Sequence, residues 1–341
     1  MNIPEPLQPQ QPRPRLYVYS PSSAVVDRNA FRRALSRLER LGYAVEVDPT
    51  ALARKQRFAG TDADRLAGIH RAAQSGADVA LLSRGGYGLT RLLSQLDYGL
   101  LAESVARGMR WVGMSDFTAL QCALLSQTGV PSWFGPALCE GFGAPRLARS
   151  GSRAGLEAID PGMLRSFQDV VAGRSHGVQW RMQAPLRLPD GIHSMPRHVR
   201  IDKATLWGGN LTLLSALVGT PYLPPVDAGI LFLEDIGEHP YRIERMCTQL
   251  LHAGVLERQQ AIVLGKFTGY VLHPQDRGFD LSSVVDWLRS RLSIPILTDL
   301  PCGHIPAKVL LPVGRAVCLQ ARRREAAIFW DGPKTAPHTL P

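Results

Sequence analysis

The chain has 341 residues, of which 45% are hydrophobic, and it contains no apolar run long enough to cross a membrane as a helix. Its formal net charge of +10 comes mainly from arginine and favours acidic partners, but no helix-turn-helix, RNA-recognition or zinc-finger pattern accompanies this charge. The five cysteines are widely spaced without a C-x-x-C pair, which indicates reduced thiols. The length allows two ordinary domains, and we expect no metal, no cofactor, no nucleic-acid partner and no membrane partner.

Residues 1–14 are rich in Pro and Gln and lack an apolar signal segment, which predicts a disordered leader and a cytoplasmic protein. A short β-prone run follows at 16–20. The next segment, 28–41, places apolar residues on one face and predicts an amphipathic helix, and 43–47 predicts a second strand. A strand, a helix and a strand at this spacing indicate a parallel sheet.

A glycine-rich loop follows the next predicted strand. Residues 61–75 are expected to form a helix, and 77–83 form an almost wholly apolar strand of the kind that helices cover on both faces. This strand runs directly into the sequence RGGYG at 84–88, where three glycines let backbone N–H groups approach a ligand. The loop alone is a weak signal. It gains weight because it leaves the carboxyl end of one parallel strand while Ser115 leaves that of the next, and ligands bind along that edge.

Ser115 occupies a predicted strand-to-helix turn. Residues 111–114 form an apolar run of strand type, and from Phe117 the apolar residues fall at helical spacing. Such a turn raises a hydroxyl above the sheet edge and places it beside the partly positive first turn of a helix. That is the position of a nucleophile. On this stretch alone, a structural role for Ser115 and Asp116 as helix N-caps is the competing interpretation.

The second half of the chain has short strands and many turns, and we expect a first domain over 15–155, a linker over 156–195 and a second domain over 196–332. Glu234 ends an apolar strand, where an unpaired buried carboxylate is costly, so its side chain should have a partner. That partner is either an arginine such as Arg242 or an imidazole. His304 follows a glycine in a short turn, and a structural hydrogen bond is the alternative to a catalytic role for it.

Six segments of the chain resemble, in order and spacing, the LD-carboxypeptidases, the serine peptidase family that includes muramoyltetrapeptide carboxypeptidase and related microcin self-immunity peptidases. The match is weakest over 141–199 and absent from the leader. The segments are FAGTDADR (58–65), RGGYGLTRLL (84–93), VGMSDFTAL (112–120), WGGNLTLLSALVGTPY (207–222), LFLEDIGEHPYRIERM (231–246) and GHIPAKVLLPVG (303–314).

The resemblance implies a catalytic triad, carried over here to Ser115, Glu234 and His304, that releases terminal D-alanine from murein tetrapeptides through an acyl-enzyme. It also implies an α/β fold with a flavodoxin-like or class I amidotransferase-like parallel sheet in the N-terminal domain. The C-terminal domain is then β-rich and of α+β type, with the site between the two domains. A homodimer without a cofactor is implied as well.

Two further sets of residues are expected at such a site. The backbone N–H groups of Gly86 and Asp116 are the candidates for the oxyanion hole, because one lies in the glycine-rich loop and the other follows the nucleophile. A carboxypeptidase must also recognise a free carboxylate, which favours arginine because its planar fork binds bidentately. Arg84 is the first candidate and Arg242 the second, with Tyr87 as an additional substrate contact.

Several alternatives stay open. Arg84 is equally compatible with a structural salt bridge to Asp116 or Glu238. A self-immunity peptidase would cleave a peptide–nucleotide antibiotic and would need a base-stacking aromatic residue; Trp207 and Trp180 are candidates, although both suit core packing.

A non-catalytic anion-binding or nucleic-acid-binding protein would show salt-dependent DNA binding and no hydrolysis. A glutamine-amidotransferase reaction is disfavoured because Ser115, not cysteine, occupies the turn, and Cys122 lies inside the following helix.

Overall fold

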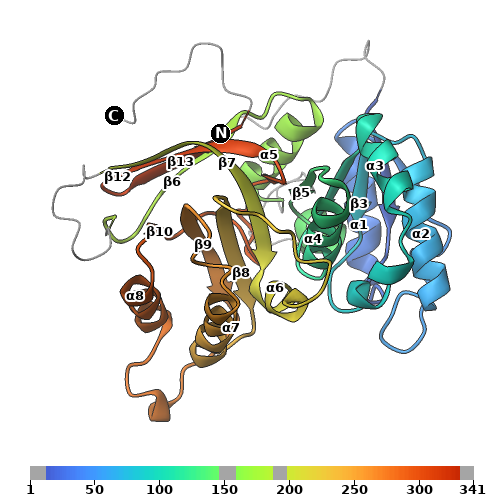
Figure 1. Cartoon of the computed structure of the whole chain (residues 1–341). Coiled ribbons are helices and arrows are strands. Elements are labelled where there is room, and N and C mark those ends of the chain that lie inside the picture. Colours follow the sequence, from blue (N-terminus) through green and yellow to red (C-terminus); the bar gives the residue numbers. More distant parts are fainter. Residues whose placement is uncertain (1–12, 146–158, 187–197, 331–341) are drawn as a thin grey trace, which may run out of the picture. The chain divides into compact units, whose positions relative to one another are not determined.

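The computed structural model describes residues 13–145, 159–186 and 198–330, which fall into two compact units (Figure 1). Unit 1 contains the chain up to Ser175 together with the returning segment Pro306–Leu311, and unit 2 contains the remainder. Almost all of the predicted leader lies outside the described residues. Within the described ranges, no helix is both long enough and apolar enough to span a bilayer.

The centre of unit 1 is a parallel sheet, as predicted. Its strands lie in the order β2-β1-β3-β4-β5, with β11 at the β5 edge, and each pairing from β2 to β5 is parallel. The chain therefore winds one way from β1 to β2 and the other way from β3 onward, so the winding direction reverses between β1 and β3. The strands are β1 (Arg15–Tyr19), β2 (Ala44–Val47), β3 (Val79–Leu82), β4 (Arg110–Gly113), β5 (Ser132–Phe134) and β11 (Leu311–Val313).

Helices cover this sheet because their apolar stripes need burial. In Figure 1, α2 and α3 lie side by side, and α3 in turn contacts α4. The N-terminus of α2 is held by a reciprocal capping box between Thr61 and Asp64, as the helix predicted over 61–75 requires. The helices of unit 1 are α1 (Arg28–Arg40), α2 (Asp62–Gln74), α3 (Tyr98–Ala106), α4 (Phe117–Thr128) and α5 (Pro161–Val171), with short turns η1 (Leu89–Arg91), η2 (Leu93–Gln95) and η3 (Leu138–Phe142).

The segment expected to be a linker contributes an element to each unit, α5 to unit 1 and β6 to unit 2. Phe167 of α5 is fully buried and packs edge-on against Phe142, with ring centroids 5.0 Å apart, and against Tyr43 at 5.8 Å. The returning segment Pro306–Leu311 is hydrogen-bonded to α5, because the backbone N–H of Leu310 donates to Ser166 Oγ at 2.9 Å. Both segments are therefore part of the core of unit 1.

Unit 2 is built on a seven-stranded mixed sheet in the order β10-β9-β8-β7-β12-β13-β6. The half from β7 to β10 is parallel and the half from β7 to β6 is antiparallel, so the long β7 belongs to both. The strands are β6 (Gly177–Arg181), β7 (His198–Asn210), β8 (Ile230–Ile236), β9 (Ala261–Thr268), β10 (Ile296–Leu297), β12 (Ala316–Arg322) and β13 (Glu325–Phe329).

Three helices follow one another along the parallel half of this sheet (Figure 1). They are α6 (Leu211–Leu217), α7 (Pro240–His252) and α8 (Leu281–Arg291), with the short turn η4 (Pro274–Asp276) before α8. The strands β8 and β9 are almost continuously buried, whereas β6 alternates between exposed and buried residues. This difference is expected for helix-covered parallel strands and for antiparallel strands with one wet face. The predicted α/β fold with a β-rich second domain is confirmed.

Candidate active site

Ser115 lies in the turn between β4 and α4, as the sequence predicts, and it has an unusual backbone. Its φ is +63°, in the left-handed region that residues with side chains seldom adopt. Strand β4 ends at Gly113 and α4 begins at Phe117, so only three residues make the reversal. A strained strand-to-helix turn of this kind is typical of an exposed nucleophile. The Ser115 residue is half-buried.

The glycine-rich loop packs directly on this turn. A Cβ at Gly85 would lie 2.8 Å from both Cβ and Oγ of Ser115, so a side chain at Gly85 has no room. Gly86 has a φ of +111°, and a Cβ there would overlap the hydroxyl of Ser23. The same hydroxyl accepts a hydrogen bond from the backbone N–H of Tyr87 at 3.1 Å. The two glycines thus let the loop and the nucleophile turn touch at backbone distance.

The oxyanion-hole candidates are the backbone N–H groups of Gly86 and Asp116. Neither donates to an acceptor in the described part of the chain. The N–H of Asp116 also belongs to the start of α4, where the helix dipole favours negative charge. Two unclaimed donors, one directly after the serine and one in the loop that packs on its turn, are suited to hold an anionic oxygen.

The side chain of Asp116 does not cap α4, although Asp116 occupies the N-cap position. Its Oδ2 instead accepts a hydrogen bond from the backbone N–H of Leu89 at 2.9 Å. Burial raises the pKa of the Asp116 carboxyl above its ordinary value. The carboxyl therefore ties the beginning of α4 to the end of the glycine-rich loop, and it forms no ion pair with Arg84. The capping interpretation accounts for neither Ser115 nor Asp116.

In unit 2, Glu234 and His304 form a hydrogen-bonded pair. The Oε2 atom of Glu234 lies 2.8 Å from Nδ1 of His304, and the Glu234 side chain is completely buried. The partner expected for Glu234 is therefore an imidazole, while Arg242 pairs with Glu238 at 3.5 Å. With Nδ1 engaged by the carboxylate, Nε2 is the nitrogen that remains to exchange a proton.

Glycine 303 and its neighbours make this pair possible. Gly303 has a φ of +120°, and a Cβ there would lie 2.9 Å from the carbonyl oxygen of Lys266 and 3.2 Å from Oε2 of Glu234. Only glycine at position 303 therefore lets the chain bring His304 against the buried carboxylate without strain.

Two polar residues that the sequence analysis did not single out complete the surroundings of Glu234. Asn210 donates from Nδ2 to Oδ1 of Asp235 at 2.8 Å and to Oε1 of Glu234 at 3.4 Å. Asp235 also accepts from the backbone N–H and the hydroxyl of Thr212, both at 2.8 Å. Because Asn210 ends β7 and Glu234 is its register partner on β8, the parallel pairing aligns these side chains. Their position in two of the family-like segments was the only sequence signal.

The predicted substrate arginines have different surroundings. Arg84 is half-buried, donates from Nη1 to the carbonyl oxygen of Ala24 at 3.1 Å, and pairs with no carboxylate among the described residues. Arg242 is paired with Glu238, and its Nε donates to the hydroxyl of Tyr241 at 3.3 Å. Of the two candidate arginines, Arg84 is therefore the one with more N–H groups available to bind a substrate carboxylate.

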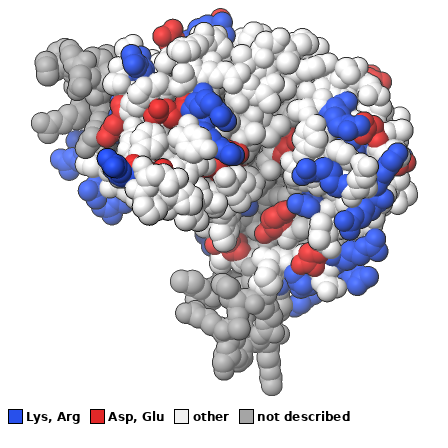
Figure 2. Space-filling model, turned by 90° about the horizontal axis from the view of Figure 1, so that it is seen from below, with Lys and Arg blue, Asp and Glu red and all other residues white. Residues whose placement is uncertain are grey.

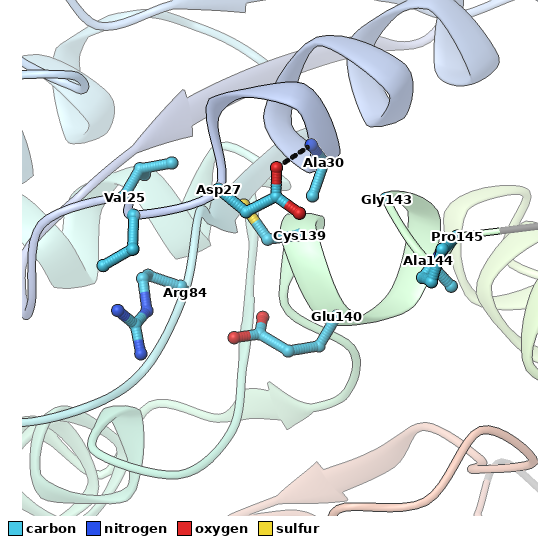
Figure 3. A pocket seen from close by; sticks show the side chains of 10 residues that line it. Val25, Asp27, Ala30, Arg84, Cys139, Glu140, Gly143, Ala144 and Pro145 are labelled. Carbon is cyan, nitrogen blue, oxygen red and sulfur yellow. Dashed lines mark hydrogen bonds between the residues drawn. The ribbon is translucent and has the colours of Figure 1, made fainter.

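Arg84 lines a pocket of about 550 Å³ in unit 1 (Figure 3). The other lining residues are Val25, Val26, Asp27, Ala30, Cys139, Glu140, Gly143, Ala144 and Pro145. Tyr87, in the same loop as Arg84, has 43% of its surface exposed and lies under the guanidinium of Arg57, 5.6 Å from the ring centroid.

The cysteine and the two tryptophans considered as alternative functional residues are buried in the core. Burial raises the pKa of the Cys122 thiol to about 12, so Cys122 is not a thiolate at neutral pH. Trp207 and Trp180 are core residues whose indole N–H groups donate to Gln259 Oε1 and to the carbonyl oxygen of Thr298, each at 2.9 Å. No three His, Cys, Asp or Glu side chains of the described ranges gather closely enough to hold a metal ion.

Comparison with known proteins agrees with the sequence resemblance. Residues 16–135 match the LD-carboxypeptidase N-terminal domain, and residues 203–319 match the LD-carboxypeptidase C-terminal domain. The murein tetrapeptide carboxypeptidase of Pseudomonas aeruginosa is 30% identical over 91% of this chain and 94% of its own.

Solved structures and a more distant relative extend the comparison. The crystal structure of muramoyltetrapeptide carboxypeptidase from Oxalobacter formigenes superposes with a TM-score of 0.79 and 36% identity, over 94% of this chain and all of the other. The microcin C7 self-immunity protein of Escherichia coli is 24% identical over 91% of this chain and 90% of its own.

Proposed function

Because the chain belongs to the LD-carboxypeptidase family, we propose that it is a serine carboxypeptidase that releases terminal D-alanine from murein tetrapeptides during peptidoglycan recycling. The observation that carries this proposal is the 2.8 Å hydrogen bond between the buried Glu234 and His304. A carboxylate that holds the Nδ1 side of an imidazole is the arrangement that turns a histidine into a general base for a serine.

In the proposed reaction, His304 takes the proton of the Ser115 hydroxyl at Nε2 while the Ser115 oxygen attacks the carbonyl carbon before D-alanine. Glu234 stabilises the imidazolium that forms. The imidazolium then gives its proton to the departing amine, which leaves as D-alanine. Water, deprotonated by the same imidazole, hydrolyses the acyl-enzyme and regenerates the Ser115 hydroxyl.

The oxyanion of each tetrahedral intermediate is proposed to bind the backbone N–H groups of Gly86 and Asp116. Their support is that both donors are unclaimed within the described chain and that the loop carrying Gly86 touches the Ser115 turn through Gly85. Donors fixed by the backbone need no reorganisation as charge develops, which makes this term large in acyl transfer.

A substrate carboxylate is proposed to bind Arg84, with Tyr87 as its neighbour in the loop. Arg84 has free donors and faces a pocket, whereas Arg242 already serves Glu238 and Tyr241. A guanidinium with unused N–H groups can accept a carboxylate bidentately, so Arg84 is the stronger of the two candidates.

The test is incubation of the purified full chain with L-Ala-γ-D-Glu-meso-diaminopimelate-D-Ala, with free D-alanine measured by mass spectrometry. Release of D-alanine by the wild type and its loss in Ser115→Ala supports the proposal. Release that persists in Ser115→Ala would reject the serine mechanism. Sedimentation of the same preparation tests the homodimer that the family resemblance implies.

Cleavage of a peptide–nucleotide amide is the second candidate, motivated by the similarity to the microcin C7 self-immunity protein. The two candidates for base stacking, Trp207 and Trp180, are both buried in the core, which weighs against it. An aminoacyl sulfamoyl adenosine offered in the same assay separates the two: turnover of this compound without turnover of the tetrapeptide would favour the second candidate.

A purely anion-binding role receives little support from the surface. On the face shown in Figure 2, arginine and lysine side chains are interspersed with acidic ones. Several arginines of unit 1 are paired, among them Arg71 with Asp48 at 2.8 Å and Arg91 with Asp62 at 2.7 Å. A steep salt-dependent affinity for DNA in a protein without hydrolytic activity would favour this role instead.

A further inference from the structure

A buried arginine of α2 contacts the end of the glycine-rich loop. The side chain of Arg65 has no exposed surface, and arginine is almost never fully buried unless it is paired. Its Nη1 atom donates to the carbonyl oxygens of Pro21 and Gly88, each at 2.9 Å. Pro21 lies in the loop after β1 and Gly88 in the loop after β3, and these two strands are neighbours in the sheet. One nitrogen therefore joins the two loops.

The contact between Arg65 and Gly88 leaves no room for a side chain. Gly88 has a φ of +146°, and a Cβ there would lie 2.5 Å from Nη1 of Arg65. The guanidinium carbon of Arg65 lies 4.8 Å from the ring centre of Phe58, and its Nη2 pairs with Asp62 of the same helix. The guanidinium is thus fixed by an ion pair and by packing as well as by its hydrogen bonds to the loops.

Arg65 and Asp116 hold opposite ends of one peptide group. The carbonyl oxygen of Gly88 accepts from Arg65, and the N–H of Leu89, in the same peptide group, donates to Oδ2 of Asp116 at 2.9 Å. The negative end of the peptide dipole thus meets the buried cation, and the positive end meets the buried carboxyl. The charge of Arg65 also opposes the rise that burial causes in the pKa of Asp116.

This peptide group is the outer anchor of the loop that carries the N–H of Gly86. At its inner end the loop continues directly from β3. At its outer end, two residues after Gly86, it is held by Arg65. Asp116 contributes the other oxyanion donor from its backbone, while its side chain binds the same peptide group. Both donors are therefore attached to one hydrogen-bonded chain that starts at Arg65.

We propose that Arg65 is a positioning residue for the oxyanion hole. Through the Gly88–Leu89 peptide group and the Asp116 carboxyl, it sets the spacing between the N–H groups of Gly86 and Asp116. The inference rests on the proposed function, because that function assigns these two donors. Arg65 needs no contact with the reacting atoms, since a misplacement of about 1 Å in a catalytic site can cost about a hundredfold in rate.

The first test is steady-state kinetics on the tetrapeptide. Arg65→Gln should lower kcat by about tenfold to a hundredfold and change KM by less than about threefold, because the donors act on the transition state. Arg65→Lys keeps the charge but lacks the fork, so its kcat should lie between the two. Arg71→Gln is the matched control. Arg71 also lies on α2 and pairs with a buried carboxylate, that of Asp48, so its loss should weaken the fold and leave kcat and KM unchanged.

A thioamide substrate separates positioning from general damage to the fold. It carries sulfur in place of the carbonyl oxygen before D-alanine, and sulfur is the weaker hydrogen-bond acceptor. The oxygen-to-sulfur ratio of kcat/KM should fall about tenfold in Arg65→Gln and keep its wild-type value in Arg71→Gln. Partial unfolding slows both substrates equally and leaves the ratio unchanged. A wild-type ratio in Arg65→Gln would overturn the proposal, however large the loss of kcat.

A double-mutant cycle tests the shared peptide group. Asp116→Ala keeps its own backbone N–H but releases the N–H of Leu89, so it should lower kcat and the oxygen-to-sulfur ratio as Arg65→Gln does. Because both side chains hold one peptide group, the double variant should lose less kcat than the product of the two single losses. Losses that multiply would show that the two side chains act independently and would contradict the proposal.

Binding of methylboronic acid separates this inference from the proposed substrate. The Ser115 oxygen bonds to boron and its proton passes to His304, which leaves a tetrahedral boronate anion with an oxygen for the oxyanion hole. Calorimetric titration of the full chain measures the affinity, with Ser115→Ala as the blank. About tenfold weaker binding in Arg65→Gln, with wild-type binding in Arg71→Gln, supports the inference even if no D-alanine is released. Equal affinity in Arg65→Gln and wild type, or no binding by the wild type, counts against it even in an active enzyme.

Discussion

Glu234 and His304 are 70 residues apart in the chain, and their side chains meet at 2.8 Å with the carboxylate fully buried. The carboxylate lies at the end of an apolar parallel strand, and a glycine lets the imidazole reach it. A buried charge in such a place costs several kcal/mol unless it is paired. The pair is therefore both a structural necessity of unit 2 and the part of the proposed machinery that orients a base.

Replacing Glu234 by glutamine should slow turnover far more than it harms folding. The amide can still accept a hydrogen bond, but it cannot stabilise an imidazolium, so we expect kcat to fall by about a hundredfold to ten-thousandfold. Steady-state kinetics on the tetrapeptide measures this. Glu257→Gln, at an exposed position of unit 2, is the control and should retain wild-type kcat. A kcat within a few-fold of wild type would show that the Glu234 charge does not assist catalysis.

Two substitutions of Ser115 should separate its chemistry from its strain. Ser115→Ala and Ser115→Gly both remove the hydroxyl, and each should lower kcat by about a thousandfold or more. Glycine accepts a φ of +63° without a Cβ penalty, so Ser115→Gly should be more stable than Ser115→Ala by up to about 1 kcal/mol in urea unfolding. Equal stability of the two variants would mean that the turn stores no strain.

The contact between the loop and the turn predicts opposite outcomes for two glycines of unit 1. A methyl group at Gly85 would lie 2.8 Å from the Ser115 side chain, so Gly85→Ala should displace the serine and abolish most D-alanine release. Gly68 lies inside α2, where a methyl group would have ordinary contacts of 3.5 Å or more with Asp48. Gly68→Ala should therefore stabilise the protein by about 0.5–1 kcal/mol and keep full activity. Full activity in Gly85→Ala would contradict the close packing of the loop.

Asp48 should make the free energy of unfolding decrease as the pH falls into the acid range. Burial opposes ionisation of its carboxyl, but hydrogen bonds from Arg71, Thr50 and Tyr17 outweigh burial and hold the pKa of Asp48 below its ordinary value. A lowered folded-state pKa stabilises the fold above the unfolded-state pKa of about 4, and this stabilisation is lost as pH falls through the folded-state value.

Asp48→Asn should accordingly lower the free energy of unfolding by about 1–3 kcal/mol at neutral pH. The difference between wild type and variant should shrink below about pH 4. Urea unfolding at a series of pH values measures it. Asp227→Asn, which breaks an exposed pair with Arg258, is the control and should cost less than about 1 kcal/mol. A difference that stays constant into acid would contradict the lowered pKa.

Short-range sequence patterns predicted the helices, strands and turns that depend mainly on neighbouring residues. The parallel sheet, the helix over 61–75 and the strand-to-helix turn at Ser115 all follow from apolar periodicity, turn residues and glycines within a few positions. The need for a partner at Glu234 was also readable, because a carboxylate at the end of an apolar strand must be compensated. Which partner it takes was not readable without the family resemblance.

Long-range contacts account for what the sequence analysis left out. Asn210 and Asp235 meet because β7 and β8 pair in one register, and no local pattern encodes that register. Glu140 lies in a short helical turn, beyond the stretches with strong periodicity, so its approach to the Arg84 pocket has no signature in the sequence. The helix α5 lies in the segment expected to be a linker, and the packing of its Phe167 against Phe142 and Tyr43 has no local signal in the sequence.

The returning segment Pro306–Leu311 has a consequence for dissecting the protein. A fragment that stops at Ser175 would lack Leu310, which is completely buried and bonded to Ser166. Neither unit is thus encoded by one uninterrupted stretch of the gene. If either half were expressed alone, or exchanged between relatives, unit 1 would lose the segment Pro306–Leu311 with its buried Leu310, and the other fragment would carry that segment without its packing partners. The two units must therefore be kept together in one chain.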